Sequence, residues 1–235
     1  MNLNKKNIIV IIGAVVIFVL LFILISLLVN QEEPVSDDND DEEVEVVFGE
    51  DIVDVDGNSY RTVEVGGQVW MAENLNTVSE YGNSWCYSDQ EFYCDRYGRL
   101  YSWEAAMAGE LEPGSQGICP NGWYLPTDED WYALESFFAT ARCDAHRLSW
   151  GCSPAGQMMK TETWGGVEDS ALAVLPAGYI NRQGGSSLLG SYSYFWTSTK
   201  IGDGVWRRGF LDAQSGILRT TENPEYGYSV RCIKK

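Results

Sequence analysis

Three acidic side chains stand together in the stretch CPNGWYLPTDEDWYAL, residues 119–134. Asp128, Glu129 and Asp130 precede Trp131, and paired carboxyl groups beside an aromatic ring are a common arrangement for general acid catalysis. If these carboxyl groups did such chemistry, the protein would be an enzyme. The elements that position them decide between catalysis and scaffold.

The same stretch has the pattern of a helix start. Thr127 stands three residues before Asp130, as in a capping box, in which each residue bonds the backbone of the other. Negative side chains in a first helical turn also meet the positive end of the helix dipole. The apolar side chains that recur at helical spacing are Trp131, Leu134, Phe138 and Ala141. We therefore predict a structural role for the three acids.

Cysteines are the second group of side chains that could do chemistry, and they are Cys86, Cys94, Cys119, Cys143, Cys152 and Cys232. An even count outside a cell membrane predicts three disulfides. Zinc is the alternative, but the chain has no Cys-x-x-Cys pair, and its only histidine is His146. Gly-x-Ser-x-Gly and His-Glu-x-x-His motifs are also absent from the sequence. We predict no catalytic site, no metal and no cofactor.

Composition predicts a folded, acidic protein. The 235 residues are 45% hydrophobic and include nine tryptophans, enough for one sizeable core or two small ones. The 34 acidic residues outnumber the 16 basic ones, and the net charge is −18. Because nucleic-acid binding requires a basic surface, we predict no nucleic-acid partner.

The N-terminus predicts a membrane anchor. Residues 8–29 carry no charge and are long enough to span a bilayer, and Lys5 and Lys6 before them predict that residues 1–7 stay in the cytoplasm. A signal peptide is the alternative, but its apolar region would be shorter. Residues 30–46 hold nine acids and no base, which predicts an extended, disordered linker rather than a calcium loop. We therefore predict a single-pass protein whose domain 47–235 lies outside the cell.

Alternation and turn residues predict the elements of this outer domain. Residues 61–70 alternate around Gly66-Gly67 as a β-hairpin, and residues 103–108 predict a short helix that Gly109 ends. Residues 143–170 predict a long surface loop, and the run ALAVLPAGYI predicts a buried strand. The runs that predict a C-terminal antiparallel sheet are SYSYFWTST, GVWRRGFLD, GILRT and YSVRCIKK.

Several motifs occur in a specific order between Ile52 and Cys232: GGQVWMAENL, CDRYGRLYSWEAA, CPNGWYLPTDEDWYAL, LPAGY, FWTST and GYSVRC. In this order they resemble the Fibrobacter succinogenes major paralogous domain family. The segments GWYLPTDEDW and YSVRC are also similar to those of C-type-lectin-like folds, which include relatives of the formylglycine-generating enzyme. The resemblance implies an α+β C-type-lectin-like domain with two helices, small antiparallel sheets and long loops, on an N-terminal transmembrane helix.

The resemblance also bears on the cysteines. In such folds a long disulfide ties the region before the LPT turn to the last strand, which implies the pair Cys119–Cys232. Proximity in the chain then favours Cys86–Cys94 and Cys143–Cys152 as the two local pairs.

The predicted function is a non-catalytic ligand-binding or adhesion module at the cell surface, with an extracellular protein or glycan as partner. The alternatives are an enzyme related to the formylglycine-generating type, which requires a reactive thiol, and a structural envelope protein without a specific ligand. The motifs of calcium-dependent sugar lectins are absent, so we predict no calcium site. Trp196 and Trp206 are predicted to be packing residues. The residues predicted to contact a ligand are Tyr192, Tyr194, Lys200, Arg207, Arg219 and Tyr226.

Overall fold

The computed structural model describes residues 19–26, 47–168 and 170–235. The chain divides into two units, Met1–Glu45 and Val46–Lys235. In the first unit residues 19–26 are helical. Within the described ranges, none of the helices combines the length and the apolar character that a membrane crossing requires. The rest of the predicted anchor and the whole acidic linker lie outside the described residues.

The second unit is built mainly from strands, so the predicted fold class is wrong. Over the described residues, strand accounts for 31% and helix for 21%, and the predicted C-type-lectin-like domain with two helices gives way to several antiparallel sheets with more, shorter helices. The physical reason is the length of the strands. Many have two residues, and a run of two residues shows no alternation by which a sequence could reveal it.

The larger of the two main sheets has the strand order β1-β4-β5-β15-β8. Its hairpin is the predicted one: β4 and β5 are joined by Gly66 and Gly67, whose φ values of 57° and 78° are those that a tight hairpin turn requires. Its strands are β1 (Val47–Phe48), β4 (Thr62–Val65), β5 (Gln68–Met71), β8 (Trp123–Tyr124) and β15 (Ile233–Lys234).

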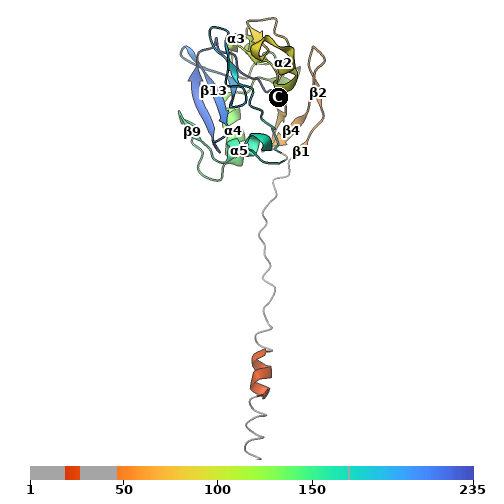
Figure 1. Ribbon diagram of the computed structural model, residues 1–235, viewed down its shortest axis with the longest axis vertical. Helices are drawn as coiled ribbons and strands as arrows, with labels where there is room; N and C mark the ends of the chain where they lie inside the picture. Colours follow the sequence, from red (N-terminus) through yellow and green to blue (C-terminus); the bar gives the residue numbers. More distant parts are fainter. Residues whose placement is uncertain (1–18, 27–46, 169) are drawn as a thin grey trace, which may run out of the picture. The chain divides into compact units, whose positions relative to one another are not determined.

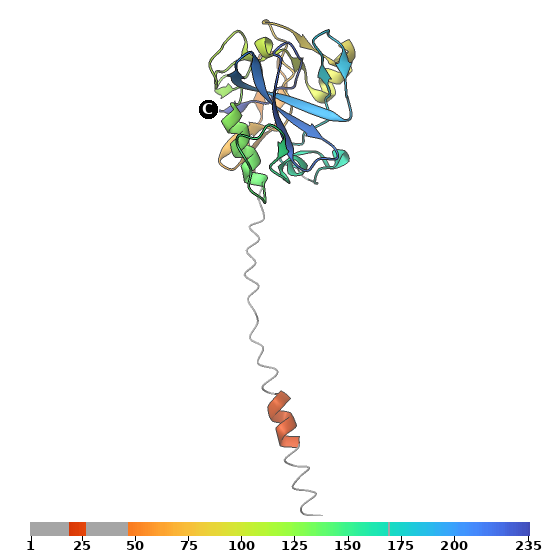
Figure 2. The same cartoon turned by 90° about the vertical axis from the view of Figure 1, so that its left-hand side faces the viewer.

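The second main sheet has the order β12-β13-β14-β9 and contains the longest strands. Its strands are β9 (Trp150–Gly151), β12 (Tyr192–Ile201), β13 (Gly204–Leu211) and β14 (Ile217–Glu222). In Figure 2 the long blue strands cross the second unit. Three of the four predicted C-terminal runs therefore form one sheet. The fourth run, YSVRCIKK, contributes β15 to the other sheet.

The remaining strands form three two-stranded sheets. They are β2 (Ile52–Val53) with β3 (Ser59–Tyr60), β6 (Ser84–Trp85) with β7 (Leu100–Tyr101), and β10 (Tyr179–Ile180) with β11 (Ser186–Ser187). The predicted strand over residues 171–180 is only partly present, because β10 is confined to its last two residues.

Among the helices, the two predicted ones are present. They are α3 (Trp103–Met107), which ends at Ala108 in the left-handed conformation, and α4 (Asp128–Phe138). The helices that the sequence analysis missed are α2 (Glu91–Tyr97), α5 (Ala155–Met159) and the 3₁₀ turns η1 (Tyr87–Asp89) and η2 (Glu162–Trp164). The predicted loop over residues 143–170 thus contains β9, α5 and η2.

Helix α4 packs against β12 and β13 of the four-stranded sheet, and Figure 1 shows it beside β13. Its Trp131 is fully buried, with its ring centroid 5.0 Å from that of Trp70 on β5 and 5.4 Å from that of Phe195 on β12. Large aromatic side chains contribute the most apolar area to a core, so Trp131 is the residue that joins the two sheets. Trp196 and Trp206 are buried too, as predicted.

The six cysteines form three disulfides, Cys86–Cys94, Cys119–Cys232 and Cys143–Cys152, which are the pairs that the resemblance and proximity implied. Cys119 precedes β8 and Cys232 precedes β15, and these two strands are paired. The long disulfide therefore fixes the C-terminal strand to its neighbour.

A buried lysine holds the turn between β13 and β14. The Lys160 ammonium donates hydrogen bonds to the carbonyl oxygens of Leu211, Asp212 and Gln214, at 2.8, 2.7 and 3.0 Å. Three carbonyl acceptors satisfy all three of its protons.

Candidate functional site

Two of the three neighbouring acids of the stretch 119–134, Asp128 and Asp130, have structural roles, as predicted. Thr127 accepts from the backbone N–H of Asp130, and the Asp130 carboxylate accepts from the backbone N–H of Thr127 at 2.8 Å, which completes the capping box. Glu129 is exposed. Asp128 has a further role that sequence reasoning missed, because it points into the protein.

Asp128 belongs to a buried network of ion pairs behind the four-stranded sheet. Its carboxylate accepts from Arg208 Nη1 and from Arg219 Nη2, both at 2.6 Å. Glu135, which follows Asp128 by about two turns of α4, pairs with Arg208 and with Arg147. Burial raises the pKa of Asp128, but hydrogen bonds from Arg219 and Arg208 and the charges of both outweigh it and hold the pKa below its usual range. Asp128 therefore stays ionised and acts as a structural anion.

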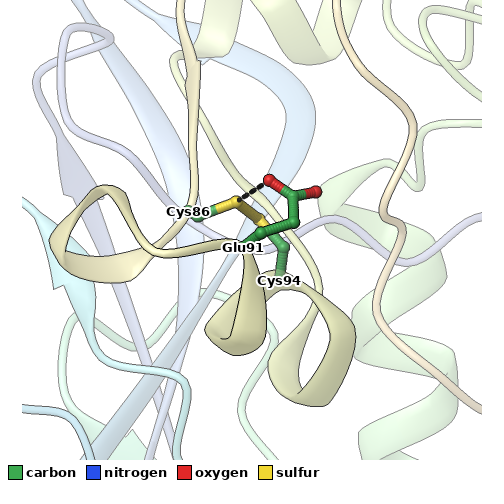
Figure 3. A group of neighbouring side chains, drawn as sticks. All are labelled: Cys86, Glu91 and Cys94. Atoms are coloured by element: carbon green, nitrogen blue, oxygen red, sulfur yellow. Dashed lines mark hydrogen bonds between the residues drawn. A yellow bond between two sulfur atoms is a disulfide. The ribbon is translucent and has the colours of Figure 1, made fainter.

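Two groups of sulfur and carboxylate atoms lie close enough together to suggest a metal site. In the first, a Glu91 carboxylate oxygen is 3.3 Å from the sulfur of Cys86, which is bonded to Cys94 (Figure 3). An oxidised sulfur has neither a proton to donate nor a thiolate lone pair for a metal. The second group, Glu135 with Cys143 and Cys152, contains a disulfide as well. In both groups the carboxylate therefore lies beside a disulfide, and the sulfur atoms are not metal ligands.

The opposite face of the four-stranded sheet carries tyrosines. Side chains alternate between the two faces of a strand, so Arg207 lies on the face opposite to Arg208. We call this surface the tyrosine face and define it as Tyr179, Tyr192, Tyr194, Arg207, Tyr226 and Tyr228. Four of these six were predicted ligand contacts, and the six come from four separate segments of the chain.

The tyrosine rings contact one another closely. Tyr194 lies at the centre: its ring centroid is 5.6 Å from those of Tyr179 and Tyr192 and 5.1 Å from that of Tyr228. Tyr226 is 6.0 Å from Tyr179. Such spacings are those of favourable aromatic pairs. The rings therefore hold one another in place.

Exposure divides the tyrosine face into inner and outer residues. Tyr194 is 8% exposed and Tyr228 2%, and burial raises the pKa of both phenols. Tyr179, Tyr192 and Tyr226 are half-buried and keep part of their surface in contact with solvent. Ligand contacts on this face would come first from the three outer tyrosines.

Glycines bring the segments of Tyr179 and Tyr228 close to their neighbours. A side chain at Gly227 would lie 2.8 Å from Ile180, and one at Gly178, whose φ is 68°, would lie 2.5 Å from a backbone carbonyl. These glycines directly precede Tyr228 and Tyr179, and both make bridges to neighbouring strands. Close backbone approach there is possible only for glycine.

Arg207 lies beneath the tyrosine rings. Its guanidinium carbon is 4.2 Å from the ring centroid of Tyr194 and 5.3 Å from that of Tyr228, and Glu222 is 3.6 Å away. Arg207 is 9% exposed, and within the described part of the chain its Nε and Nη1 have no hydrogen-bond partner. A buried guanidinium is thus balanced by aromatic rings and one carboxylate.

Lys200 occupies a different place. Its ammonium lies 5.0 Å from the ring centroid of Trp103 and lines a cavity of about 570 Å³ together with Trp85, Arg182 and Glu225. The β-bulge between Trp196 and Lys200 interrupts the pairing that places the other side chains of β12. Lys200 is therefore not part of the tyrosine face.

Arg219 lies on the opposite side of the sheet from the tyrosines. Its Nε and Nη2 donate to Asp128, its Nη1 donates to the Arg147 carbonyl at 2.8 Å, and its guanidinium stacks 3.5 Å from the ring centroid of Trp206. All three nitrogens are used within the protein. We therefore remove Arg219 from the predicted contacts.

Tyr179 and Tyr228 were not predicted. Both stand in motifs that carried the family resemblance, LPAGY and GYSVRC, where a glycine immediately precedes the tyrosine. That Gly-Tyr pair is the signal that could have found them, since it combines close backbone approach with an aromatic side chain.

Comparison with known proteins shows one family. No curated protein and no solved structure matches the chain. The family model described as Fibrobacter succinogenes major domain matches residues 63–234, which include both main sheets except β1 and part of β4, and all six residues of the tyrosine face. The chain therefore belongs to the Fibrobacter succinogenes major domain family.

Proposed function

We propose that the second unit is a non-catalytic binding module and that the tyrosine face is its recognition surface. The observation that carries this proposal is the gathering of five tyrosines and Arg207 from four chain segments onto one face of the longest strands. Tyrosine and arginine dominate the energetics of many binding surfaces. The buried ion pairs on the other face keep the strands in place.

The chemistry of the face suits recognition by contact. A tyrosine ring offers a large area with few rotatable bonds, so little conformational entropy is lost when it binds, and its hydroxyl adds a hydrogen bond. Tyr179 and Tyr192 already pack against the inner residue Tyr194, and Tyr226 packs against the inner residue Tyr228. An extracellular protein or a glycan would fit this mixture of apolar rings and hydroxyls.

An enzyme of the formylglycine-generating type is the first alternative. Such chemistry requires a reactive thiolate, and all six cysteines of this chain are paired in disulfides. This pairing supports the binding module over that enzyme. A structural envelope protein without a specific ligand is the second alternative, and it gives no reason for tyrosines to gather on one side.

Location is part of the proposal and rests on the sequence. The uncharged run 8–29, followed by the acidic residues 30–46, would place the second unit outside the cell membrane. Disulfides persist in such oxidising surroundings. Protease added to intact cells should release the second unit, whereas an intracellular unit would remain intact.

An array experiment tests the proposed function. The full chain in detergent micelles is applied to glycan and protein arrays, in parallel with a Tyr192→Ala/Tyr226→Ala double variant. The proposal predicts reproducible signals that the double variant loses. Arrays without a signal would favour a structural envelope protein, and signals that the double variant keeps would place recognition elsewhere.

A further inference from the structure

A second cavity lies on a different part of the unit. Its volume is about 490 Å³, within the range of small-molecule sites. The lining includes Asn58, Arg61, Glu73, Asn76, Arg96 and Arg231, and none of its residues belongs to the tyrosine face.

Arg231 is the most deeply buried charged group of this cavity, at 2% exposure. Its Nε donates to the Asn74 side chain at 2.9 Å and its Nη1 to the Leu172 carbonyl. Among the residues that the structure describes, no carboxylate forms an ion pair with it. Buried arginines are ordinarily paired, because an uncompensated charge in the interior is costly.

Glu73, the carboxylate whose charge acts most on Arg231, is already engaged. Glu73 accepts from both the backbone N–H and the guanidinium of Arg61. Burial lowers the pKa of Arg231 to about 9, so the guanidinium keeps its charge at neutral pH. An anion that entered the cavity would therefore meet a positive charge on which Glu73 acts but with which it forms no ion pair.

The other lining groups define what else a ligand would need. Arg61, Arg96 and Arg231 outnumber Glu73 and Asp95, in a chain whose overall charge is −18. Amides and hydroxyls make up much of the rest, including Asn76, whose Oδ1 is buried without a partner in the described part of the chain. Such groups pair with ligand hydroxyls.

We propose that this cavity binds a small hydroxylated carboxylate, of which a uronic acid is an example, with the ligand carboxylate on Arg231. A guanidinium and a carboxylate are both charged at neutral pH, so the hydrogen bonds between them are stronger than those between neutral groups. Their planar shapes also allow two parallel hydrogen bonds. Asn76 and the Oδ1 of Asn58, whose Nδ2 already donates to Asp54 at 2.8 Å, would pair with the hydroxyl groups. This site is separate from the tyrosine face and does not depend on its role.

Calorimetric titration of the full chain in detergent micelles tests this proposal, with glucuronate, glucose and inorganic phosphate as probes. We expect saturable 1:1 binding of glucuronate. Glucose lacks the carboxylate, so its affinity should be at least about tenfold lower than that of glucuronate. Arg231→Gln should abolish the glucuronate signal.

Because Arg231 also bonds to the backbone, its replacement could unfold the unit, and a second variant avoids this difficulty. Arg96 is exposed beside the cavity, so Arg96→Glu should weaken glucuronate binding about fivefold without loss of folding. Arg142→Glu makes the same charge change at an exposed position outside the cavity and should leave affinity within about twofold.

Four results would overturn the proposal: no glucuronate binding to the folded protein, equal affinity for glucose, binding of phosphate alone, or equal weakening by Arg96→Glu and Arg142→Glu. The Tyr192→Ala/Tyr226→Ala double variant should bind glucuronate as the unaltered chain does. The cavity and the tyrosine face can therefore fail independently.

Discussion

Arg208 in the middle of β13 donates a 2.6 Å hydrogen bond from Nη1 to Asp128, the first residue of α4. This pair connects the start of the helix to the centre of the four-stranded sheet. The adjacent residue Arg207 points to the other side, toward the tyrosines. Two successive residues of one strand therefore serve the two faces of the sheet: Arg208 holds the helix, and the buried Arg207 lies beneath the tyrosine rings of the proposed recognition surface.

Replacement of Asp128 should destabilise the protein strongly. In Asp128→Ala, Arg208 and Arg219 remain buried with part of their charge unpaired, a loss that typically amounts to about 3–5 kcal/mol. Glu129→Ala removes the exposed neighbouring acid and should change the free energy of unfolding by less than about 0.5 kcal/mol. Denaturant unfolding of both variants measures the difference, and equal effects would show that the ion pairs contribute little.

Stability should fall at acid pH for an identifiable reason. The folded-state pKa of Asp128 is lower than its unfolded value of about 3.9, so its contribution is fully present above that pH and is lost as the pH falls through the folded pKa. Asp54 behaves alike: burial raises its pKa, but hydrogen bonds from Thr77, Tyr60 and Asn58 outweigh this.

The measurement is the melting temperature between pH 7 and pH 2. Asp128→Asn and Asp54→Asn should each be less stable than the unaltered protein at pH 7 and should lose less stability below about pH 4. Parallel curves for the variants and the unaltered protein would contradict the assignment of acid sensitivity to these two carboxyl groups.

The long disulfide should matter more than a short one. Cys119–Cys232 closes 113 residues of sequence separation and Cys86–Cys94 only 8. When a disulfide is removed, the unfolded chain gains conformational entropy that increases with the logarithm of the loop length. Cys119→Ser/Cys232→Ser should therefore lower the free energy of unfolding by about 2–5 kcal/mol. Cys86→Ser/Cys94→Ser should cost less. A larger loss for the short pair, by denaturant unfolding, would contradict this order.

Part of this architecture could be predicted from the sequence. The Gly66-Gly67 hairpin, the Thr127 capping box and three of the C-terminal strands each have a local signal that agrees with the fold. Short elements such as α2 lack such a signal: its burial is limited to Cys94, so no apolar period marks it.

The candidate site could be predicted only in part, because the face of the strand on which each side chain lies was not assigned for every residue. Arg219 was grouped with the tyrosines, yet it stands two residues after Ile217, which is fully buried, and residues two apart share a face of a strand. That parity could have assigned it to the core. The meeting of Tyr179 with Tyr194 depends on long-range packing, which no local pattern reports.

Gly209 offers a test of the tyrosine face that leaves every tyrosine in place. A side chain there would lie 2.9 Å from the ring of Tyr194, whereas one at Gly204 on the same strand would have its nearest neighbour at 3.4 Å. Gly209→Ala should displace the Tyr194 ring and cost about 1–3 kcal/mol of stability. Gly204→Ala is the matched control.

Near-ultraviolet circular dichroism reports the displacement. Tyrosine signals should change in Gly209→Ala and stay as they are in Gly204→Ala, with array binding reduced only in the first variant. Unchanged spectra and binding in Gly209→Ala would mean that the packing of Tyr194 is not what shapes the surface.

The most direct test of the binding role is the affinity of an array-identified ligand, measured by calorimetry with the full chain in micelles. Tyr192→Ala/Tyr226→Ala removes two outer rings of the tyrosine face. Tyr132→Ala removes a half-buried tyrosine on α4 that bonds to the Cys143 carbonyl. The account predicts a loss of at least about 2 kcal/mol of binding free energy in the double variant, the size typical of recognition hot spots, and an unchanged affinity in Tyr132→Ala. Unchanged affinity in the double variant, or the same loss in Tyr132→Ala, would contradict it.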